Sequence, residues 1–293
     1  MKILLTGGSG FLGSALAVNW LKAGHEVALL LRPASNTKRL QGLDSFFNIG
    51  RFTNDVEISA FVENVQPEVV VHNASTFGRQ GETRVQLFDA NIRIGLVIIQ
   101  ALKKVGHTVS FINAGSALRP EVSLYALAKN QFAHWGRMIA TLENGDFKFI
   151  NVLLQHVYGP NDDVSKFSTY VLHACYRNDP YINLTAGEQR RDFIYIDDAV
   201  SAYNILLTHC NQLDTIIDIE VGSGVAPTIR QFVETVHRIT ESNTNLLFGA
   251  LPYRPNEAML CLANLEYMKK LGWTPKFDIN SGLNKTMQME FKK

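Results

Sequence analysis

Apolar and polar positions along the first half of the chain follow two alternating periods. Short runs are almost continuously apolar and rich in Val, Ile, Leu and Phe. These runs lie at 2–6, 26–31, 45–49, 68–72, 109–113 and 147–154. A strand that is apolar on both faces must be covered on both sides, so the pattern predicts a buried parallel sheet.

The segments between these runs have the length and the apolar period of helices. They lie near 11–23, 55–65, 82–104 and 124–143. Regular alternation of strands and helices predicts an α/β fold with a Rossmann-like, doubly wound parallel sheet. After about residue 160 the elements become shorter and richer in Pro, Asn and Asp. We therefore expect a first domain at 1–160, to which a segment near 193–222 returns, and a smaller substrate-binding region at 161–293.

Composition excludes several classes of protein. The chain has 293 residues, of which 46% are hydrophobic and 19% charged, and its net charge is +1. This balance gives no general attraction to nucleic acid or to an anionic membrane. No uninterrupted apolar run reaches the roughly 18–20 residues of a membrane span. Cys175, Cys210 and Cys261 are odd in number and far apart, which fits neither a disulfide framework nor a metal site. We expect a cytoplasmic protein without a metal.

A glycine-rich turn joins the first strand to the first helix. Its glycines have the spacing G-x-x-G-x-x-G, which allows a tight turn and a close backbone approach to a pyrophosphate. The following helix N-terminus offers free N–H groups and a partial positive charge. The residues that we expect to bind a dinucleotide cofactor here are Gly7, Ser9, Gly10, Phe11, Leu12 and Gly13.

The residue that follows the second strand indicates which dinucleotide is bound. An Asp or Glu there would hold a ribose 2′-hydroxyl, whereas an Arg attracts a 2′-phosphate. Here Leu31 occupies the usual acidic place and Arg32 follows it. The sequence therefore favours NADP(H) and assigns the domain at 1–160 to that cofactor. Lys38 and Arg39 either assist or are solvated loop cations.

Ser116, Tyr125 and Lys129 form a candidate catalytic set. Ser123 is expected to cap the helix that follows, and Tyr125 and Lys129 are four residues apart, so they share one face of it. A nearby ammonium stabilises tyrosinate, so we expect Lys129 to lower the pKa of Tyr125. Such a tyrosine exchanges a proton with an alcohol or carbonyl oxygen, which Ser116 can hold by a hydrogen bond.

Together these features resemble the extended short-chain dehydrogenase/reductases, which act on nucleotide-diphosphate sugars. The stretches "TGGSGFLG", "VVHNAS", "YALAK", "HVYGP", "QRRDFIYIDDAV", "VGSG" and "LGWTP" fall in the order of that family. The resemblance implies further cofactor-binding residues: Ala74, Ser75, Asn91, Tyr125, Lys129, Leu154 and Val157. Asn91 corresponds to a structural asparagine near the catalytic serine.

The resemblance also implies residues for a sugar-nucleotide substrate. Arg191 and Arg254 correspond to arginines that clamp the diphosphate, and His156 occupies a place that often holds Asn. Phe77 and Arg79 either touch the sugar or pack within their loop. The full set that we expect to bind substrate is Phe77, Arg79, His156, Lys166, Arg191, Arg254 and Glu257.

Within the family, the stretches "SLYALAK", "QHVYGPNDDVSKF", "LTAGEQRRDF", "IEVGSG" and "YRPNEAM" are most similar to the synthases of CDP-abequose and CDP-paratose. This likeness implies NADPH-dependent reduction of the C4 ketone of CDP-4-keto-3,6-dideoxy-D-glucose, for bacterial O-antigen. The alternative is an NAD-dependent sugar 4-epimerase, which uses the same three catalytic residues. A non-catalytic NADP(H)-sensing regulator is a third reading, although such proteins usually lack the Tyr–Lys pair.

The chain departs from the family pattern at three places. The tract from Ser116 to Tyr125 is short, and "SALRP" lacks the Asp–Glu pair of the family's 4,6-dehydratases. Arg51 lies where an Asp often contacts the adenine amino group. The helices at 82–104 and 124–143 carry apolar stripes, which fit either a homodimeric four-helix bundle or ordinary core packing.

Overall fold

Internal contacts divide the protein into two compact units. The computed structural model describes residues 1–79, 81–143 and 147–291. One unit comprises Met1–Leu153 and Tyr203–Ile219, and the other comprises Leu154–Ala202 and Glu220–Lys293. The assignment of cofactor binding to one region and of substrate binding to the other stays a prediction.

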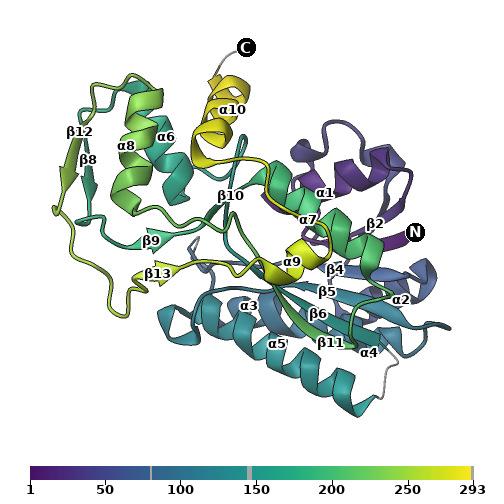
Figure 1. Ribbon diagram of the computed structural model, residues 1–293. Coiled ribbons are helices and arrows are strands. Elements are labelled where there is room, and N and C mark those ends of the chain that lie inside the picture. The colour runs from purple at the N-terminus through teal and green to yellow at the C-terminus, as the bar shows by residue number, and fades with distance from the viewer. Residues whose placement is uncertain (80, 144–146, 292–293) are drawn as a thin grey trace. The chain divides into compact units, whose positions relative to one another are not determined.

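A seven-stranded parallel sheet forms the centre of the first unit (Figure 1). Its strands lie in the order β11-β6-β5-β4-β1-β2-β3. They are β1 (Lys2–Thr6), β2 (Glu26–Leu31), β3 (Asn48–Arg51), β4 (Val69–His72), β5 (Val109–Ala114), β6 (Phe147–Leu154) and β11 (Ile216–Val221). The strand order reverses between β1 and β4, and in doubly wound sheets such a switch point is where ligands bind. The predicted fold class is confirmed.

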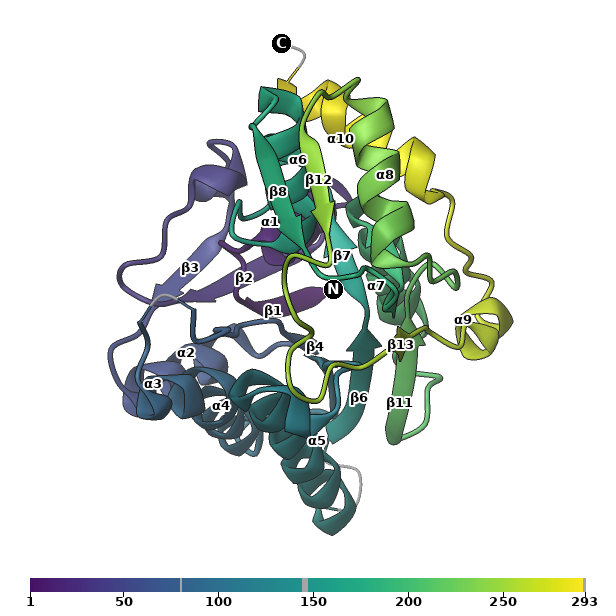
Figure 2. The same cartoon turned by 90° about the vertical axis from the view of Figure 1, so that its left-hand side faces the viewer.

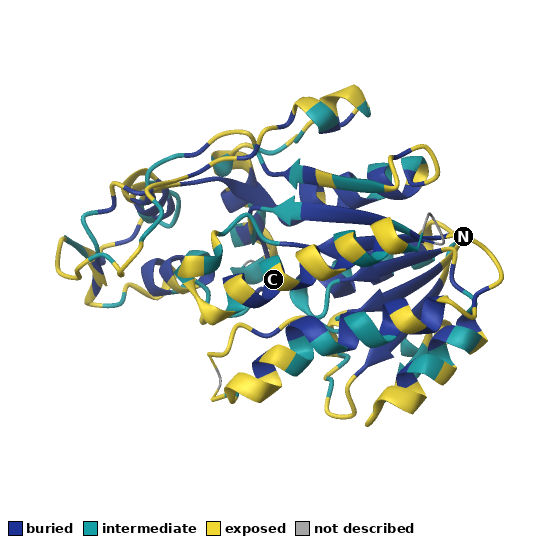
Figure 3. Cartoon of the chain, turned by 90° about the horizontal axis from the view of Figure 1, so that it is seen from below, coloured by how far each residue is buried: buried dark blue, intermediate teal, exposed yellow. Residues whose placement is uncertain are grey.

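The helices of the first unit cover both faces of this sheet (Figure 1). They are α1 (Phe11–Lys22), α2 (Asp55–Val65), α3 (Arg84–Phe88), α4 (Ile94–Leu102), α5 (Leu124–Leu142) and the C-terminal part of α7 (Ile196–His209). Apolar residues of α2, α4 and α5 pack with β1, β4 and β5 in one buried cluster. Figure 3 accordingly shows dark blue along the strands and yellow on the outer turns of the helices.

One predicted strand, at 45–49, is wrong in its position. Asp44–Phe46 forms a short 3-10 helix after Gly42, whose φ of +76° makes a turn. Phe46 is exposed, and pairing with β2 begins only at Asn48. The apolar run therefore marks the approach to an edge strand, because only its last two residues enter the sheet.

The predicted helix at 82–104 is interrupted. A π-helical turn, Asp89–Arg93, lies between α3 and α4. By length and composition alone, Arg84–Leu102 could cross a membrane, but 50% of it is buried within the protein. Ile94, Ile98 and Ile99 of this stretch belong to the core cluster, as expected of a core helix.

The second unit consists of short parallel strand pairs and helices (Figure 2). The pairs are β7 (His156–Tyr158) with β10 (Phe193–Tyr195), β8 (Tyr181–Leu184) with β12 (Asn245–Phe248), and β9 (Arg190–Arg191) with β13 (Leu260–Cys261). The helices are α6 (Phe167–Arg177), the N-terminal part of α7, α8 (Ile229–Ile239), α9 (Glu266–Lys270) and α10 (Ile279–Phe291).

The buried carboxylate of Asp192 joins several loops of the second unit. It accepts hydrogen bonds from the Ser223 N–H at 2.6 Å, the Gly224 N–H at 3.0 Å and the Ala263 N–H at 3.2 Å. The Ser223 hydroxyl adds another at 2.7 Å. A buried charge is tolerated only when it is hydrogen-bonded in this way, so Asp192 fixes loops that no strand holds.

Candidate active site

The glycine turn between β1 and α1 is packed too closely for any larger residue at two of its positions. Gly7 has a φ of +68°, and a Cβ there would lie 2.8 Å from the Ala74 nitrogen. A Cβ on Gly13 would lie 2.1 Å from the Gly7 carbonyl oxygen. The Gly10 N–H donates to that same oxygen at 2.9 Å. Glycine is therefore required at 7 and 13 by geometry.

The N-terminus of α1 is open toward a ligand. Gly10 is the N-cap, no side chain caps the helix, and its first turn contains no acid. An added Cβ on Gly10 would meet only the Gly7 carbonyl oxygen, at 3.2 Å. A helix start whose N-cap has no side chain and makes no side-chain cap bond fits a pyrophosphate. Ser9 and Phe11 are partly exposed, whereas Leu12 lies in the core and offers only its backbone.

The loop after β4 is held against this turn by buried hydrogen bonds. The Ala74 N–H donates to the Thr6 hydroxyl at 2.9 Å, and that hydroxyl also bonds His72 at 3.0 Å. The amide of Asn91 accepts from the Thr76 N–H at 3.1 Å and donates to the Thr76 carbonyl at 3.0 Å.

Asn91 is enclosed by the loop that it bonds. Its side chain also donates to the Leu87 carbonyl at 2.9 Å and the residue is 0% exposed, while its expected contact with the cofactor stays a prediction. It shapes the loop that carries Ala74 and Ser75 and makes no surface of its own.

Tyr125 and Lys129 lie one turn apart on α5. The Ser123 hydroxyl accepts from the Ala126 N–H at 3.1 Å, which confirms the predicted N-cap. Tyr125 is partly buried, whereas Lys129 is 1% exposed. The helix thus presents the tyrosine at its first turn and buries the lysine beneath it.

Ser116 follows β5 and is joined to α5 by a residue that the sequence did not single out. The Ser116 hydroxyl accepts from the Leu118 N–H at 3.2 Å. The Asn130 amide donates to the Leu118 carbonyl at 3.0 Å and to the Ala126 carbonyl at 2.9 Å. Asn130 therefore fixes the serine turn to the helix of Tyr125.

Contacts of the Tyr125 ring run to the loop after β4. Ser75 forms a hydrogen bond with Tyr125. The Phe77 ring lies with its centroid 4.5 Å from that of Tyr125, and the Arg79 guanidinium lies 5.3 Å from the Phe77 centroid. The structure thus brings Ser75, Phe77 and Arg79 to the candidate catalytic tyrosine.

Electrostatics at Tyr125 differ from the sequence-based expectation. Burial raises the pKa of Tyr125 to about 12, and the groups that act to lower it are Ser75 and Arg79. Burial also lowers the pKa of Lys129 to about 8. The prediction that Lys129 depresses the pKa of Tyr125 is therefore wrong for the protein by itself, because desolvation raises that pKa and Lys129 is not among the groups that act to lower it. At neutral pH Tyr125 keeps its proton and can donate it.

Arg32 lies directly after β2 with its side chain exposed. Lys38 and Arg39 begin a short 3-10 helix, Lys38–Leu40. Within the ranges that the structure describes, Arg32 forms no ion pair with a carboxylate. Its charge is therefore available to an anion.

In the second unit, Arg191 and Glu257 form one ion pair. Arg191 on β9 is buried, and its guanidinium bonds the Glu257 carboxylate and donates to the Arg190 carbonyl at 2.8 Å. The Glu257 N–H donates to the Arg254 carbonyl at 3.1 Å, so the pair also fixes the turn that carries the exposed Arg254. Arg191 thus helps to fix the turn of residues 254–257 through its ion pair with Glu257.

His156 lies close to two cations of the same unit. Desolvation, helped by the charges of Arg191 and Lys166, lowers the pKa of His156 to about 4. Lys166 precedes α6 and pairs with Asp162 at 2.8 Å. His156 is therefore neutral near pH 7, and each of the two cations beside it is paired with a carboxylate, Arg191 with Glu257 and Lys166 with Asp162. Leu154 and Val157, on either side of it, are partly exposed.

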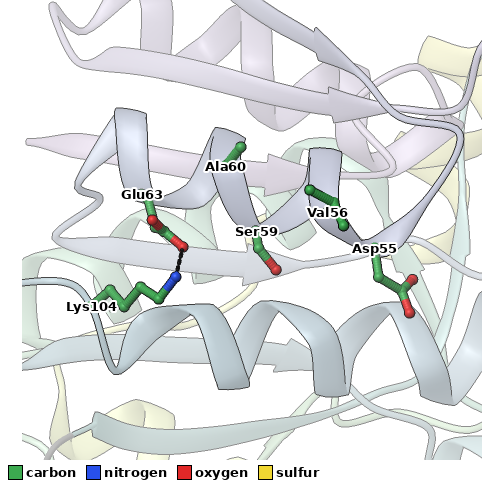
Figure 4. Close-up of a pocket in the computed structure, with 6 residues that line it drawn as sticks. All are labelled: Asp55, Val56, Ser59, Ala60, Glu63 and Lys104. Atoms are coloured by element: carbon green, nitrogen blue, oxygen red, sulfur yellow. Dashed lines mark hydrogen bonds and ion pairs between the residues drawn. The ribbon is translucent and has the colours of Figure 1, made fainter.

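An open surface pocket lies elsewhere on the first unit. Figure 4 shows the residues that line it, which are Asp55, Val56, Ser59, Ala60, Glu63 and Lys104. Lys104 pairs with Glu63 across it at 2.7 Å. None of the predicted site residues lines this pocket.

Comparison with known proteins identifies the family. The model of the NAD dependent epimerase/dehydratase family matches residues 3–222. The chain belongs to this family. Two similar relatives are CDP-abequose synthases: that of Salmonella muenchen is 30% identical over 99% of this chain and 98% of its own, and that of Salmonella typhimurium is 27% identical over 98% and 97%. The family prediction is confirmed.

Solved structures of this epimerase/dehydratase family share the fold. The UDP-glucose 4-epimerase of Thermotoga maritima has a TM-score of 0.86 and 21% identity, covering 99% of this chain and 98% of its own. At this identity the likeness shows the fold alone. The roles of the individual site residues stay predictions, and the contacts above show which of them the protein brings together.

Proposed function

We propose that the protein reduces the C4 ketone of a nucleotide-linked deoxysugar with NADPH. The proposed substrate is CDP-4-keto-3,6-dideoxy-D-glucose, and the product is CDP-abequose or CDP-paratose for O-antigen. The observation that carries the proposal is Tyr125, a protonated tyrosine one turn from Lys129, in a chain that matches CDP-abequose synthases over 98–99% of its length.

The first unit fits the cofactor. The crowded glycine turn and the uncapped start of α1 suit a pyrophosphate, and the exposed Arg32 suits a ribose 2′-phosphate. Bound NADPH would supply a hydride to the carbonyl carbon of the sugar. Gly10, Ala74 and Arg32 are the residues that support this assignment.

Tyr125 is the proposed proton donor. As the carbonyl carbon gains a hydride, the carbonyl oxygen takes the phenolic proton, the tyrosine O–H bond breaks and an alcohol O–H forms. Ser116 donates a hydrogen bond to the same oxygen. Lys129, buried and cationic below its pKa of about 8, takes up its proposed support of the resulting tyrosinate only when cofactor and substrate are bound. Solvent then returns the proton.

The second unit supplies the proposed nucleotide-binding side chains. Arg254 and Lys166 would bind the diphosphate, with Arg191 contributing charge while its partner Glu257 fixes the Arg254 turn. A neutral His156 would accept or donate one hydrogen bond without adding charge.

The experiment is incubation of the purified protein with NADPH and CDP-4-keto-3,6-dideoxy-D-glucose, followed by NMR of the product. The expected result is consumption of one NADPH for each sugar and a single C4 epimer. Tightly retained NAD together with interconversion of C4 epimers would instead establish the epimerase. Binding of NADP(H) without any turnover would establish the regulator.

We also propose that a second copy covers one face of the first unit. Exposed apolar side chains lie on α3 and α5: Val85, Phe88, Leu124, Trp135, Met138 and Leu142. Those of α5 follow a helical period, so they form one stripe. A contiguous exposed apolar stripe marks a surface that another molecule covers. Sedimentation equilibrium of the wild type against Trp135→Glu tests the dimer, which should dissociate in the variant.

A further inference from the structure

Arg51 reaches from the end of β3 to the loop that follows β2. Residue 51 pairs with Leu31 in the sheet, so its side chain starts beside the end of the neighbouring strand. Its Nη1 donates to the Arg32 carbonyl at 3.1 Å, the Pro33 carbonyl at 2.8 Å and the Ser35 carbonyl at 3.4 Å. One guanidinium nitrogen thus contacts three carbonyl oxygens of the segment 32–35.

The segment that Arg51 gathers is a tight turn. The Ser35 N–H donates to the Arg32 carbonyl at 3.0 Å, and Pro33 occupies the position of this turn where its fixed φ is favoured. On the other side, the Phe52 N–H donates to the Leu31 carbonyl at 3.2 Å. The backbone of Arg32 is therefore fixed before and after the residue, and both anchors come from the end of β3.

The positive charges of Arg32 and Arg51 are not neutralised by carboxylates of the described residues. In residues 1–79, 81–143 and 147–291, no carboxylate forms an ion pair with Arg32 or with Arg51. Carbonyl oxygens are neutral acceptors, so the three bonds orient Arg51 without cancelling its charge. Ordering a long side chain such as that of Arg51 costs conformational entropy. Because this cost is met during folding, it does not have to be met again when a ligand binds.

We propose that Arg51 is a positioning residue for a ribose 2′-phosphate, which it favours by holding the Arg32–Ser35 turn so that Arg32 is preorganised for the phosphate. The inference rests on the proposed cofactor and on no other part of the proposed function. At the position where the family resemblance implies an Asp beside the adenine, this chain has an arginine that is bonded to its own neighbouring loop.

The test is calorimetric titration of NADP⁺ and NAD⁺ into wild type, Arg32→Ala, Arg51→Met and the double variant. In Arg51→Met, the Kd for NADP⁺ should rise about tenfold, while that for NAD⁺ stays within about twofold. In the Arg32→Ala background, Arg51→Met should have almost no further effect, because it acts through Arg32. Arg84→Met, an exposed arginine on α3, is the matched control.

A second variant keeps the test decisive if Arg51→Met folds poorly. Pro33→Gly loosens the same turn and removes no cation, so it should reduce the NADP⁺ preference in the same direction. Full additivity of Arg51→Met with Arg32→Ala, or an unchanged preference in Pro33→Gly, would overturn the proposal in favour of direct phosphate contact. A wild type without NADP⁺ preference would overturn it together with the cofactor assignment. Failure to reduce the keto sugar, with the preference intact, would overturn only the proposed reaction.

Discussion

In our proposal the first unit would bind its ligand through backbone N–H groups of a glycine turn, whereas the second unit would use the charged side chains of Arg191, Lys166 and Arg254. In the first unit the contact surface is set by close packing, since a Cβ on Gly13 would overlap the Gly7 carbonyl. In the second it is set by ion pairs, such as Arg191 with Glu257 and Lys166 with Asp162. Substitutions should therefore affect geometry in one unit and affinity in the other.

Tyr125→Phe should have the largest effect on turnover. It keeps the ring and its contact with Phe77 but removes the donated proton, so kcat should fall about 10²–10⁴-fold. Fold and NADPH binding should be retained, as measured by circular dichroism and calorimetry. Lys129→Met should weaken both turnover and NADPH binding. A Tyr125→Phe protein with near wild-type kcat would rule out the proposed acid.

Gly13→Ala should disturb the geometry of the first unit. The added methyl group would lie 2.1 Å from a backbone oxygen, and such overpacking costs about 1–3 kcal/mol of unfolding free energy. NADPH affinity should fall along with stability in urea titrations. Gly106→Ala is the control, because no atom lies within 4 Å of its added Cβ. Equal stability of the two variants would mean that the turn is less tightly packed than described.

Arg32→Ala should erase most of a preference for NADPH over NADH that we expect to be at least about tenfold in kcat/KM. A charge-assisted contact to phosphate contributes about 1.5–3 kcal/mol, which is the basis of this figure. Lys38→Ala distinguishes an assisting cation from a solvated one: unchanged preference assigns it to solvent. Equal use of NADH by the wild type would contradict the cofactor assignment.

Arg254→Gln and Arg191→Gln should distinguish a residue that binds substrate from one that also stabilises the second unit. The exposed Arg254 contacts only the substrate in our proposal, so its loss should raise KM about tenfold with little change in kcat or Tm. Loss of Arg191 leaves the Glu257 carboxylate without its partner and should lower Tm as well as raise KM. A variant that mainly lowers kcat would contradict the claim that substitutions in the second unit act on substrate affinity.

The smallest expected effect is a change with pH that comes from Lys129. Burial lowers its pKa to about 8, from 10.5 for an exposed lysine. Between these values the folded protein binds fewer protons than the unfolded chain, so stability rises with pH in that window. Turnover should fall over the same range, since the ammonium that supports tyrosinate is lost. Urea unfolding and kcat above and below pH 8 test both, and Lys129→Met should abolish the stability change.

Local sequence patterns were sufficient to predict a helix or strand whose position depends on its own residues. The helix predicted at 55–65 coincides with α2, and the strand predicted at 26–31 coincides with β2, because period and composition act within each segment. Ser123 was identified as an N-cap from its position before an apolar helix. The strand predicted at 45–49 failed because β3 lies at the edge of the sheet, where its start depends on pairing with β2.

The candidate site was predictable in its residue types and not in its contacts. Tyr125 and Lys129 follow from helix spacing, and Gly7, Gly10 and Gly13 follow from their place after β1. Asn130, which ties the Ser116 turn to α5, gives no local signal, because its partner Leu118 lies twelve residues away.

The sequence by itself determined the alternation of strands and helices, the glycine turn, the Tyr–Lys pair and the cation after β2, because each depends on neighbours within a few positions. Only the tertiary structure decided that Tyr125 keeps its proton, since desolvation depends on what packs around the ring. It also decided that Asn91 bonds the backbone of a loop and that Arg51 holds the turn of Arg32. These outcomes join segments far apart along the chain, and the physical reason is that burial and hydrogen-bond partners exist only once those segments meet.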